Sequence, residues 1–344
     1  MATQVLSDIT GALSLFFLPE LQRQMNRHSV GLSLIPKRMG RGKTHNWDTQ
    51  FSGATAASFS EGADAGAAAQ DVSVAAALSW SQYRSIFGVS GLAKATSATS
   101  PGSAEELLNI VAMHAKNSAA KLASTLNSEI FSGSSNIVGM DTAFSASGTY
   151  AGISKATYPE WAGNVSANSG TPRALTKTLM DTLDKNVYKA SGMSCDALLT
   201  TPEVVVKYES LFDSTVRHIV ENGEISAQSR GMSGKIVRDR SGFSGYSYKG
   251  KPIFRDKDAT AGHMYFLSLD YISFVTLPPS GLGQTAVAAM AAALADDEGA
   301  PSGVMGAVEY LAKLGDSDRF QVKVYPLLEV ERPNAQGLLD DIAE

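Results

Sequence analysis

Residues 52–79 contain too little apolar side-chain area to form a core of their own. Eleven of these 28 residues are alanine, and the apolar side chains larger than alanine are Phe59, Val72, Val74 and Leu78. Burying so little area does not offset the conformational entropy lost on ordering a backbone, about 1–2 kcal/mol per residue. Another surface must therefore hold this stretch, either the rest of the chain or neighbouring copies of it. We expect neighbouring copies.

Length, charge and hydropathy limit the number of domains and the classes of protein to which the chain can belong. A chain of 344 residues can form one large or two modest domains with an ample core. A net charge of −5, from 29 basic and 34 acidic side chains, argues against a dedicated nucleic-acid-binding protein, whose surface is usually strongly basic. The apolar run Leu13–Leu18 is far shorter than the ~20 residues of a membrane span. Neither a membrane segment nor a signal peptide is expected.

The first half of the chain predicts a long hairpin followed by a long helix. Apolar and small residues alternate around Val74 and again around Phe87, which predicts two extended strands within 46–92. Ser103 and Glu106 have the spacing of a capping box. Apolar side chains then recur every three or four residues as far as Ile130, which predicts one helix over 103–132.

The second half mixes helices and strands without a βαβα rhythm. Threonine–proline pairs predict helix starts at Thr171 and Thr201, and Gly192 is expected to end the first of these helices. Strands are predicted at 246–248, 252–254, 264–267 and 272–276, and one longer strand at 320–330. An alanine-rich insertion is expected near 281–318. This mixture predicts the α+β class.

No catalytic, cofactor-binding or metal site is predicted. Gly40-Arg41-Gly42-Lys43-Thr44 has part of a phosphate-binding loop, but Lys37 occupies the position of the required first glycine. We expect an exposed basic turn there. The five histidines lack the spacing of metal ligands. Cys195 has no partner base nearby in the sequence, and because it is the single cysteine, no intramolecular disulfide can form.

Six sequence segments, taken in their order along the chain, resemble segments of the major capsid proteins of tailed double-stranded DNA bacteriophages. The most specific is Gly-Thr-Tyr-Ala-Gly-Ile-Ser-Lys-Ala-Thr-Tyr-Pro-Glu-Trp at 148–161, which is similar to a glycine- and tyrosine-containing segment common in that family. The others are 80–83, 88–91, 250–254, 264–271 and 334–339.

The resemblance implies the Hong Kong-type phage capsid fold. It implies an N-terminal arm at 1–45, an extended loop at 46–92, a peripheral domain formed by 93–170 and 320–344, and an axial domain at 171–319. The helix over 103–132 would be the spine of the peripheral domain, and the alanine-rich insertion would belong to the axial domain.

The implied function is structural rather than enzymatic. Pentamers and hexamers of the chain would form an icosahedral phage head, the virion capsid, assembled in the cytoplasm of a host bacterium around double-stranded DNA that is not read by sequence. A portal protein and a decoration protein are further expected partners. Only about 45 residues precede the loop, so a separate scaffolding protein is also expected. Two alternatives stay open: an encapsulin-type shell around protein cargo, and a nucleotide-binding or hydrolytic enzyme built on Gly40–Thr44.

Contacts between copies are expected at charged residues. The loop carries three carboxylates, and the turn before it is basic. We expect the first group to meet the second group of a neighbouring copy: Glu61, Asp64 and Asp71 against Lys37, Arg38, Arg41 and Lys43. Some family members join the loop to a neighbour by a lysine–asparagine isopeptide bond. No lysine lies between Lys43 and Lys94, so we expect a non-covalent shell.

Overall fold

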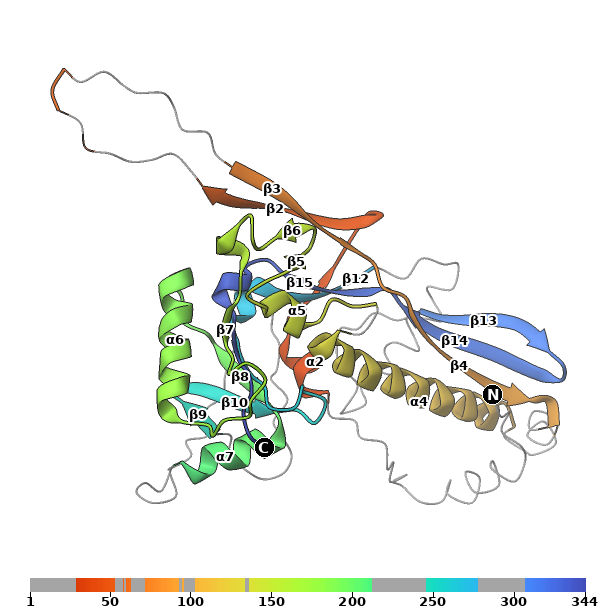
Figure 1. Cartoon of the computed structure of the whole chain (residues 1–344). Coiled ribbons are helices and arrows are strands. Elements are labelled where there is room, and N and C mark those ends of the chain that lie inside the picture. Colours follow the sequence, from red (N-terminus) through yellow and green to blue (C-terminus); the bar gives the residue numbers. More distant parts are fainter. Residues whose placement is uncertain are drawn as a thin grey trace. The chain divides into compact units, whose positions relative to one another are not determined.

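The computed structural model describes residues 29–52, 58, 60–62, 72–92, 95, 103–133, 136–211, 246–277 and 307–344 (Figure 1). The chain divides into two compact units, each made of three segments. The first unit is Met1–Gly40, Ser81–Ile130 and Phe274–Pro326; the second is Arg41–Trp80, Phe131–Ser273 and Leu327–Glu344. Most of the insertion expected near 281–318 lies outside the described residues.

The long helix of the first unit is α4 (Ser103–Ser132), which confirms the helix predicted over 103–132. From the predicted apolar stripe, Leu122, Leu126 and Ile130 are buried. Asn127 on the same helix is fully buried, and its Oδ1 accepts the N–H of Leu32 at 2.9 Å. This hydrogen bond fastens the short helix α2 (Val30–Leu34) to α4.

A three-stranded antiparallel sheet also belongs to the first unit, in the order β13 (Ala307–Leu314), β14 (Ser317–Val324), β4 (Tyr83–Ser90). The rings of Phe87 and Phe320 stack across β4 and β14 with centroids 5.3 Å apart. The hairpin predicted over 46–92 is therefore present only in part: β2 (Thr44–Ser52) pairs with β3 (Val72–Ser79), whereas β4 lies outside that hairpin. In the same unit, β1 (Lys37–Met39) pairs in parallel with residues 274–276 of β12 (Ile272–Thr276).

A six-stranded sheet forms the centre of the second unit. Its order is β7 (Asn164–Ser166), β16 (Gly337–Leu339), β11 (Met264–Leu267), β8 (Ala197–Thr200), β10 (Lys251–Arg255), β9 (Tyr246–Tyr248). Side chains on both faces of β11 are buried: Met264 and Phe266 join the core formed with α6 (Lys177–Ser191) and α7 (Pro202–Ser210), while Tyr265 contacts Phe131 and Phe144.

The helix starts in the second unit were predicted with mixed success. Thr201 caps α7 as predicted, accepting the N–H of Val204 at 3.3 Å. The preceding helix, however, starts later than predicted: α6 begins at Lys177 and is capped by Thr176. Arg173 pairs with Ile342 in a parallel bridge, which keeps the backbone after Thr171 extended. Gly192 ends α6 in the left-handed conformation, φ 74°, as predicted.

The strand predicted over 320–330 is two strands, β14 and β15 (Pro326–Val330). Proline has no N–H to donate to a ladder and is tolerated as the first residue of a strand, which explains the break at Pro326. The expected domain boundary between 319 and 320 falls inside β14. β16 joins β7 and β11 in one sheet, although the resemblance places 337–339 and 264–267 in different domains. The domain division stays a prediction.

Candidate functional site

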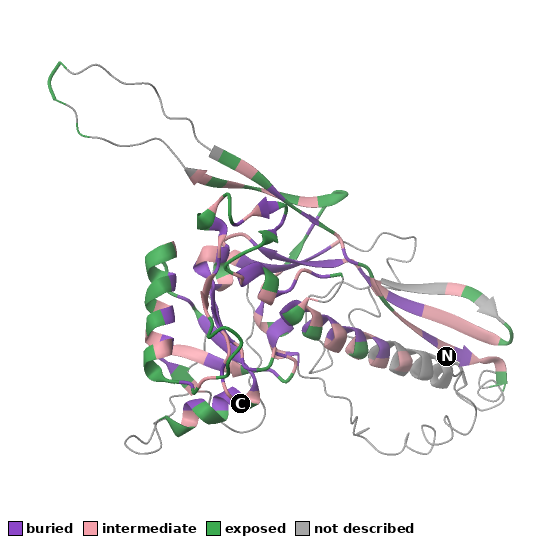
Figure 2. Cartoon of the chain, in the orientation of Figure 1, coloured by how far each residue is buried: buried purple, intermediate pink, exposed green. Residues whose placement is uncertain are grey.

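A two-stranded antiparallel ribbon, formed by β2 (Thr44–Ser52) and β3, carries most of the alanine-rich stretch that the structure describes. Exposed and less exposed side chains alternate along both strands (Figure 2). Alternation is expected where one face of a ribbon packs on a body and the other faces outward. The outward face consists of Thr44, Asn46, Asp48 and Gln50 on β2, and Ser73, Ala75, Ala77 and Ser79 on β3.

Aromatic side chains attach the inward face of the ribbon to the second unit's own body. Phe51 stacks on Tyr158 with ring centroids 4.5 Å apart and meets Trp161 edge-on at 5.7 Å. His45 Nε2 lies 2.8 Å from Glu329 Oε1. Backbone contacts add to these, because Ala77 N–H donates to Ala151 O at 2.9 Å.

These contacts correct part of the first expectation. The ribbon is held by contacts with the rest of its own chain, because β2 supplies the large aromatic side chains that the alanine-rich β3 lacks. The segment that joins the strands lies outside the described residues, except for 58 and 60–62. For that segment, the expectation of contact with neighbouring copies stays a prediction.

The segment that carries the main sequence resemblance, 148–161, packs against the inward face of the ribbon. It contains β5 (Thr149–Tyr150), β6 (Ile153–Ser154) and a 3₁₀ turn at Pro159–Trp161. The hydroxyl of Tyr150 accepts the N–H of Val330 at 2.8 Å, and Trp161 Nε1 donates to Tyr150 O at 3.1 Å. Burial is the main reason that the pKa of Tyr150 is raised, which keeps its hydroxyl protonated.

Lys155, in the same segment, is 3 % exposed and has carbonyl groups as its partners. Its ammonium donates to the backbone oxygens of Thr142, Ala143 and Ser145 at 2.8–2.9 Å, and to Ser145 Oγ at 2.8 Å. These carbonyls are at the C-terminal end of α5 (Met140–Phe144), where a helix favours positive charge. Burial lowers the pKa of Lys155 to about 8. Sequence reasoning noticed this lysine only as part of a motif.

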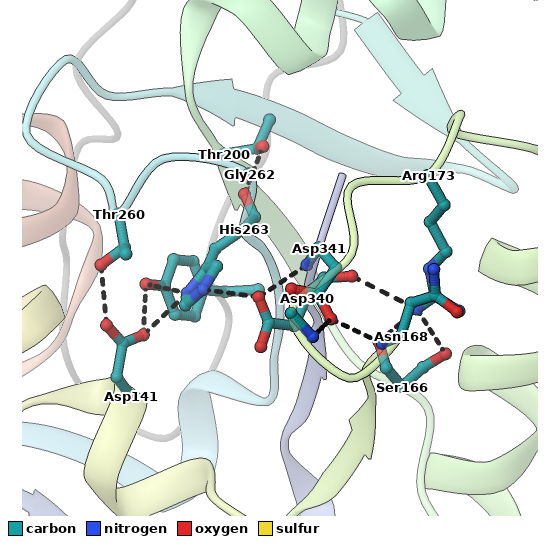
Figure 3. Close-up of polar contacts among 12 residues, drawn as sticks. Asp141, Ser166, Asn168, Arg173, Thr200, Thr260, Gly262, His263, Asp340 and Asp341 are labelled. Carbon is teal, nitrogen blue, oxygen red and sulfur yellow. Dashed lines mark hydrogen bonds and ion pairs between the residues drawn. The ribbon is translucent and has the colours of Figure 1, made fainter. Parts of the chain in front are cut away.

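A second polar cluster, which includes Asp141 in the first turn of α5, is centred on His263 (Figure 3). Its Nδ1 lies 3.0 Å from Asp141 Oδ1, and its Nε2 lies 2.8 Å from Asp340 Oδ1. Asp141 also accepts hydrogen bonds from Tyr265 OH at 2.6 Å and Thr260 Oγ1 at 2.7 Å. Sequence reasoning missed this cluster, because its members lie up to 199 positions apart and no short motif joins them.

Next to this cluster, Asp341 and Arg173 organise the loop that leads into α6 (Figure 3). Asp341 Oδ2 accepts the N–H groups of Asn168 at 2.6 Å and Gly170 at 3.0 Å. The hydrogen bond from Asn168 is the main reason that the pKa of Asp341 is lowered. Arg173 donates to Ser166 O and Oγ and, at 3.3 Å, to Asp340 O. These hydrogen bonds therefore join the loop at 166–173 to the C-terminal segment at 340–341.

The charged residues predicted to contact neighbouring copies are mostly accessible. Arg38, Arg41, Lys43 and Glu61 are exposed, and Lys37 is half-buried, which lowers its pKa to about 8. Lys37 is therefore a weaker source of positive charge than the two arginines. Asp64 and Asp71 lie outside the described residues. A single chain brings no contact between copies into view, so the predicted pairing is untested.

The geometry around Gly40–Thr44 does not suit a nucleotide. A phosphate-binding loop leads from a strand into a helix, whose N-terminus faces the phosphate. Here Thr44 begins strand β2, and Gly40 N–H donates to Thr276 O at 2.9 Å. Cys195 is buried, and burial is the main reason that its pKa is raised to about 11, so its thiol is a poor nucleophile.

Comparisons with known proteins agree on one kind of protein. A family model described as the SU10 major capsid protein matches residues 26–343. A solved capsid of cyanophage A-1(L) is 18 % identical, with a TM-score of 0.66, covering 95 % of this chain and 96 % of that one. The capsid of an empty GTA particle is 12 % identical, with a TM-score of 0.59, covering 99 % of this chain and 100 % of the other.

A third solved structure is the holo-SrpI encapsulin complex of Synechococcus elongatus, which is 12 % identical with a TM-score of 0.56 and covers 99 % of this chain and 96 % of that one. At these identities the likenesses establish the fold alone, and they confirm the α+β Hong Kong-type phage capsid fold. No curated protein matches the chain. Among the helices of the described residues, none is long and apolar enough to cross a membrane.

Proposed function

Because the chain belongs to the SU10 major capsid protein family, we propose that its copies assemble into pentamers and hexamers of an icosahedral phage head that encloses double-stranded DNA. The observation that carries this proposal is the family match over residues 26–343, which spans both units. The role is structural, without a chemical step. Its place is the virion, with assembly in the cytoplasm of a host bacterium.

The proposed parts of the capsid subunit follow from the elements of the structure. We assign α4 as the spine helix and the β13-β14-β4 sheet as its partner in the peripheral domain. The strands β8, β9, β10 and β11 of the six-stranded sheet, with α6 and α7, would be the core of the axial domain. The extended loop would begin on the β2–β3 ribbon, whose aromatic face packs on the body of its own chain.

We propose that the acidic loop residues of one copy contact the basic turn of a neighbour. Arg41 and Lys43 are exposed in that turn, and Glu61 is exposed in the loop. A single exposed ion pair contributes only about 0–1 kcal/mol, and salt screens it. Repetition over many copies makes the sum significant, while the small side chains around Glu61 permit close approach. No lysine lies on the loop between Lys43 and Lys94, so the proposed shell is non-covalent.

Reversing the basic turn is expected to lower particle yield. The double variant Arg41→Glu/Lys43→Glu places like charges opposite each other and should reduce the yield of particles several-fold at low salt. Adding Asp64→Lys and Asp71→Lys should restore much of the yield by re-forming opposite charges. Sedimentation of particles away from free subunits measures both effects.

The matched control is Lys185→Glu/Lys189→Glu on the exposed face of α6, which changes net charge equally. If the control lowers particle yield as much as the test variant, net charge rather than pairing is responsible. A failure of the four-residue swap to restore any yield would also contradict the pairing.

Electron microscopy of purified particles, combined with a nuclease-protection assay, tests the proposed function itself. Icosahedral shells containing protected DNA are expected. Shells that hold protein cargo and no DNA would instead support the encapsulin-type alternative, which the structural likeness to the SrpI complex keeps in view. A portal protein, a separate scaffolding protein and a decoration protein are the further partners that we propose for the assembling head, and mass spectrometry of the particles would identify them.

A further inference from the structure

Both ring nitrogens of His263 face a carboxylate oxygen. Asp141 Oδ1 lies 3.0 Å from Nδ1, and Asp340 Oδ1 lies 2.8 Å from Nε2. A neutral imidazole carries a single N–H, so it can donate to only one of these acceptors. Its second nitrogen would then present a lone pair to a carboxylate. The protonated ring donates to both, and this arrangement of acceptors therefore selects the charged form.

The two carboxylates come from parts of the chain that are far apart in sequence. Asp141 lies in the first turn of α5, whereas Asp340 directly follows β16, the second strand of the six-stranded sheet. His263 itself lies at the turn before β11, where its N–H donates to Thr260 O at 3.2 Å. The ring thus connects α5, β11 and the segment after β16 through one side chain.

Further groups surround the ring. The hydroxyl of Tyr265 on β11 lies 3.3 Å from Nδ1 and donates to Asp141. Asp341 carries a further negative charge that interacts with the ring. The guanidinium of Arg173 donates to Asp340 O at 3.3 Å. The side chains of His263, Asp141 and Asp340 are only 15 %, 21 % and 30 % exposed, so water screens their charges incompletely.

We propose that His263 is a proton-dependent clamp, which in its charged form ties the segment after β16 to α5 and on deprotonation releases that segment. The clamp is a property of the single chain, so it does not depend on the proposed shell. Asp341, Arg173 and Glu344 hold the same segment by other hydrogen bonds, which explains why release would be local rather than a loss of the whole sheet.

The direction of the pH effect follows from the ring's surroundings. Burial lowers the pKa of His263, but the hydrogen bonds and charges of Asp141 and Asp340 outweigh it, so the pKa is raised. A group whose pKa is raised on folding stabilises the fold fully below its unfolded value of about 6.5. That contribution is lost as the pH rises through the pKa of the folded state. The clamp is therefore closed in mildly acidic solution and opens toward alkaline pH.

Hydrogen exchange of the full-length protein from about pH 6 to about pH 9 tests the clamp across the range in which such a histidine titrates. After correction for the intrinsic pH dependence of exchange, protection of 337–344 should fall with rising pH. The fall is expected to be roughly tenfold for each unit by which the clamped pKa exceeds the released one. His263→Gln and Asp340→Asn should each remove this pH dependence. An unchanged slope in both variants would overturn the proposal.

His45→Gln is the matched control, because His45 lies against one carboxylate, that of Glu329, in the same unit. It should leave the pH dependence of 337–344 unchanged. Nitrogen-15 spectra of the histidine-labelled wild-type protein give a measurement that requires no variant to fold. They should show one ring that stays doubly protonated above the pH at which an exposed histidine loses its proton. If every ring signal titrates as a free histidine does, no clamp exists.

Discussion

Replacing Gly163 with alanine is expected to destabilise the second unit by about 4 kcal/mol or more, enough to leave most of the protein insoluble. An alanine Cβ at this position would lie 1.9 Å from Phe144 O, 2.6 Å from its carbonyl carbon and 2.8 Å from its Cα. These are backbone atoms at the end of α5, and they cannot rotate away. Gly163 N–H also donates to Ser145 O at 3.2 Å, so relieving the clash would break this contact.

Chemical denaturation of the soluble fraction, together with the soluble yield, measures the effect. Gly170→Ala is the matched control: Gly170 has a positive φ of 78°, and nothing lies within 4 Å of an added Cβ. It should cost only about 1 kcal/mol, the strain of a side chain in left-handed backbone. If the two variants are equally stable, the close approach of 163 to Phe144 is not present in the protein.

Lys155→Met is expected to cost about 2–3 kcal/mol. Methionine fills similar space, but it leaves the carbonyl oxygens of Thr142, Ala143 and Ser145 without the donor that satisfies them. Each unsatisfied buried acceptor carries a desolvation penalty. The loss is limited because burying the ammonium is itself unfavourable, as the lowered pKa of about 8 indicates.

The lowered pKa also fixes the pH dependence of this effect. Between about pH 8 and the ordinary lysine pKa of 10.5, the lysine is protonated in the unfolded chain and neutral in the folded one. The wild-type protein therefore gains stability relative to the methionine variant as the pH rises through that window. Denaturant midpoints at three pH values measure this change. Lys185→Met, on the exposed face of α6, should change stability by less than about 0.5 kcal/mol.

Local patterns predicted the elements that local forces determine. The helix over 103–132 is α4, and Thr201 and Gly192 act as the cap and the end that their residue types indicate. The fold class followed from the order of six segments, each of them a weak signal alone. For the helix, its cap and its terminal glycine, the information lies within a few neighbouring residues, where backbone geometry and capping decide the structure.

Pairing between distant strands was not predictable from the same patterns. β4 alternates like a hairpin strand, but it pairs with β14, more than 220 positions later in the chain. The ribbon was expected to lack support because β3 is alanine-rich, while the aromatic residues that support it lie on β2 and at 150–161. The histidine cluster was missed because its members lie on a helix, in a turn and after a strand, and no local pattern shows which distant residues meet.

The position of β16 has a consequence for how each copy is made. This strand lies between β7 and β11, so the six-stranded sheet cannot be completed until synthesis has passed residue 339. A nascent chain has β7, β8, β9, β10 and β11 well before it has the strand that joins β7 to the rest. Such late, long-range pairing is slow compared with local helix formation. Chains that stop early would thus lack the complete sheet. The order of synthesis itself would keep such incomplete subunits from competing with finished ones for places in an assembly.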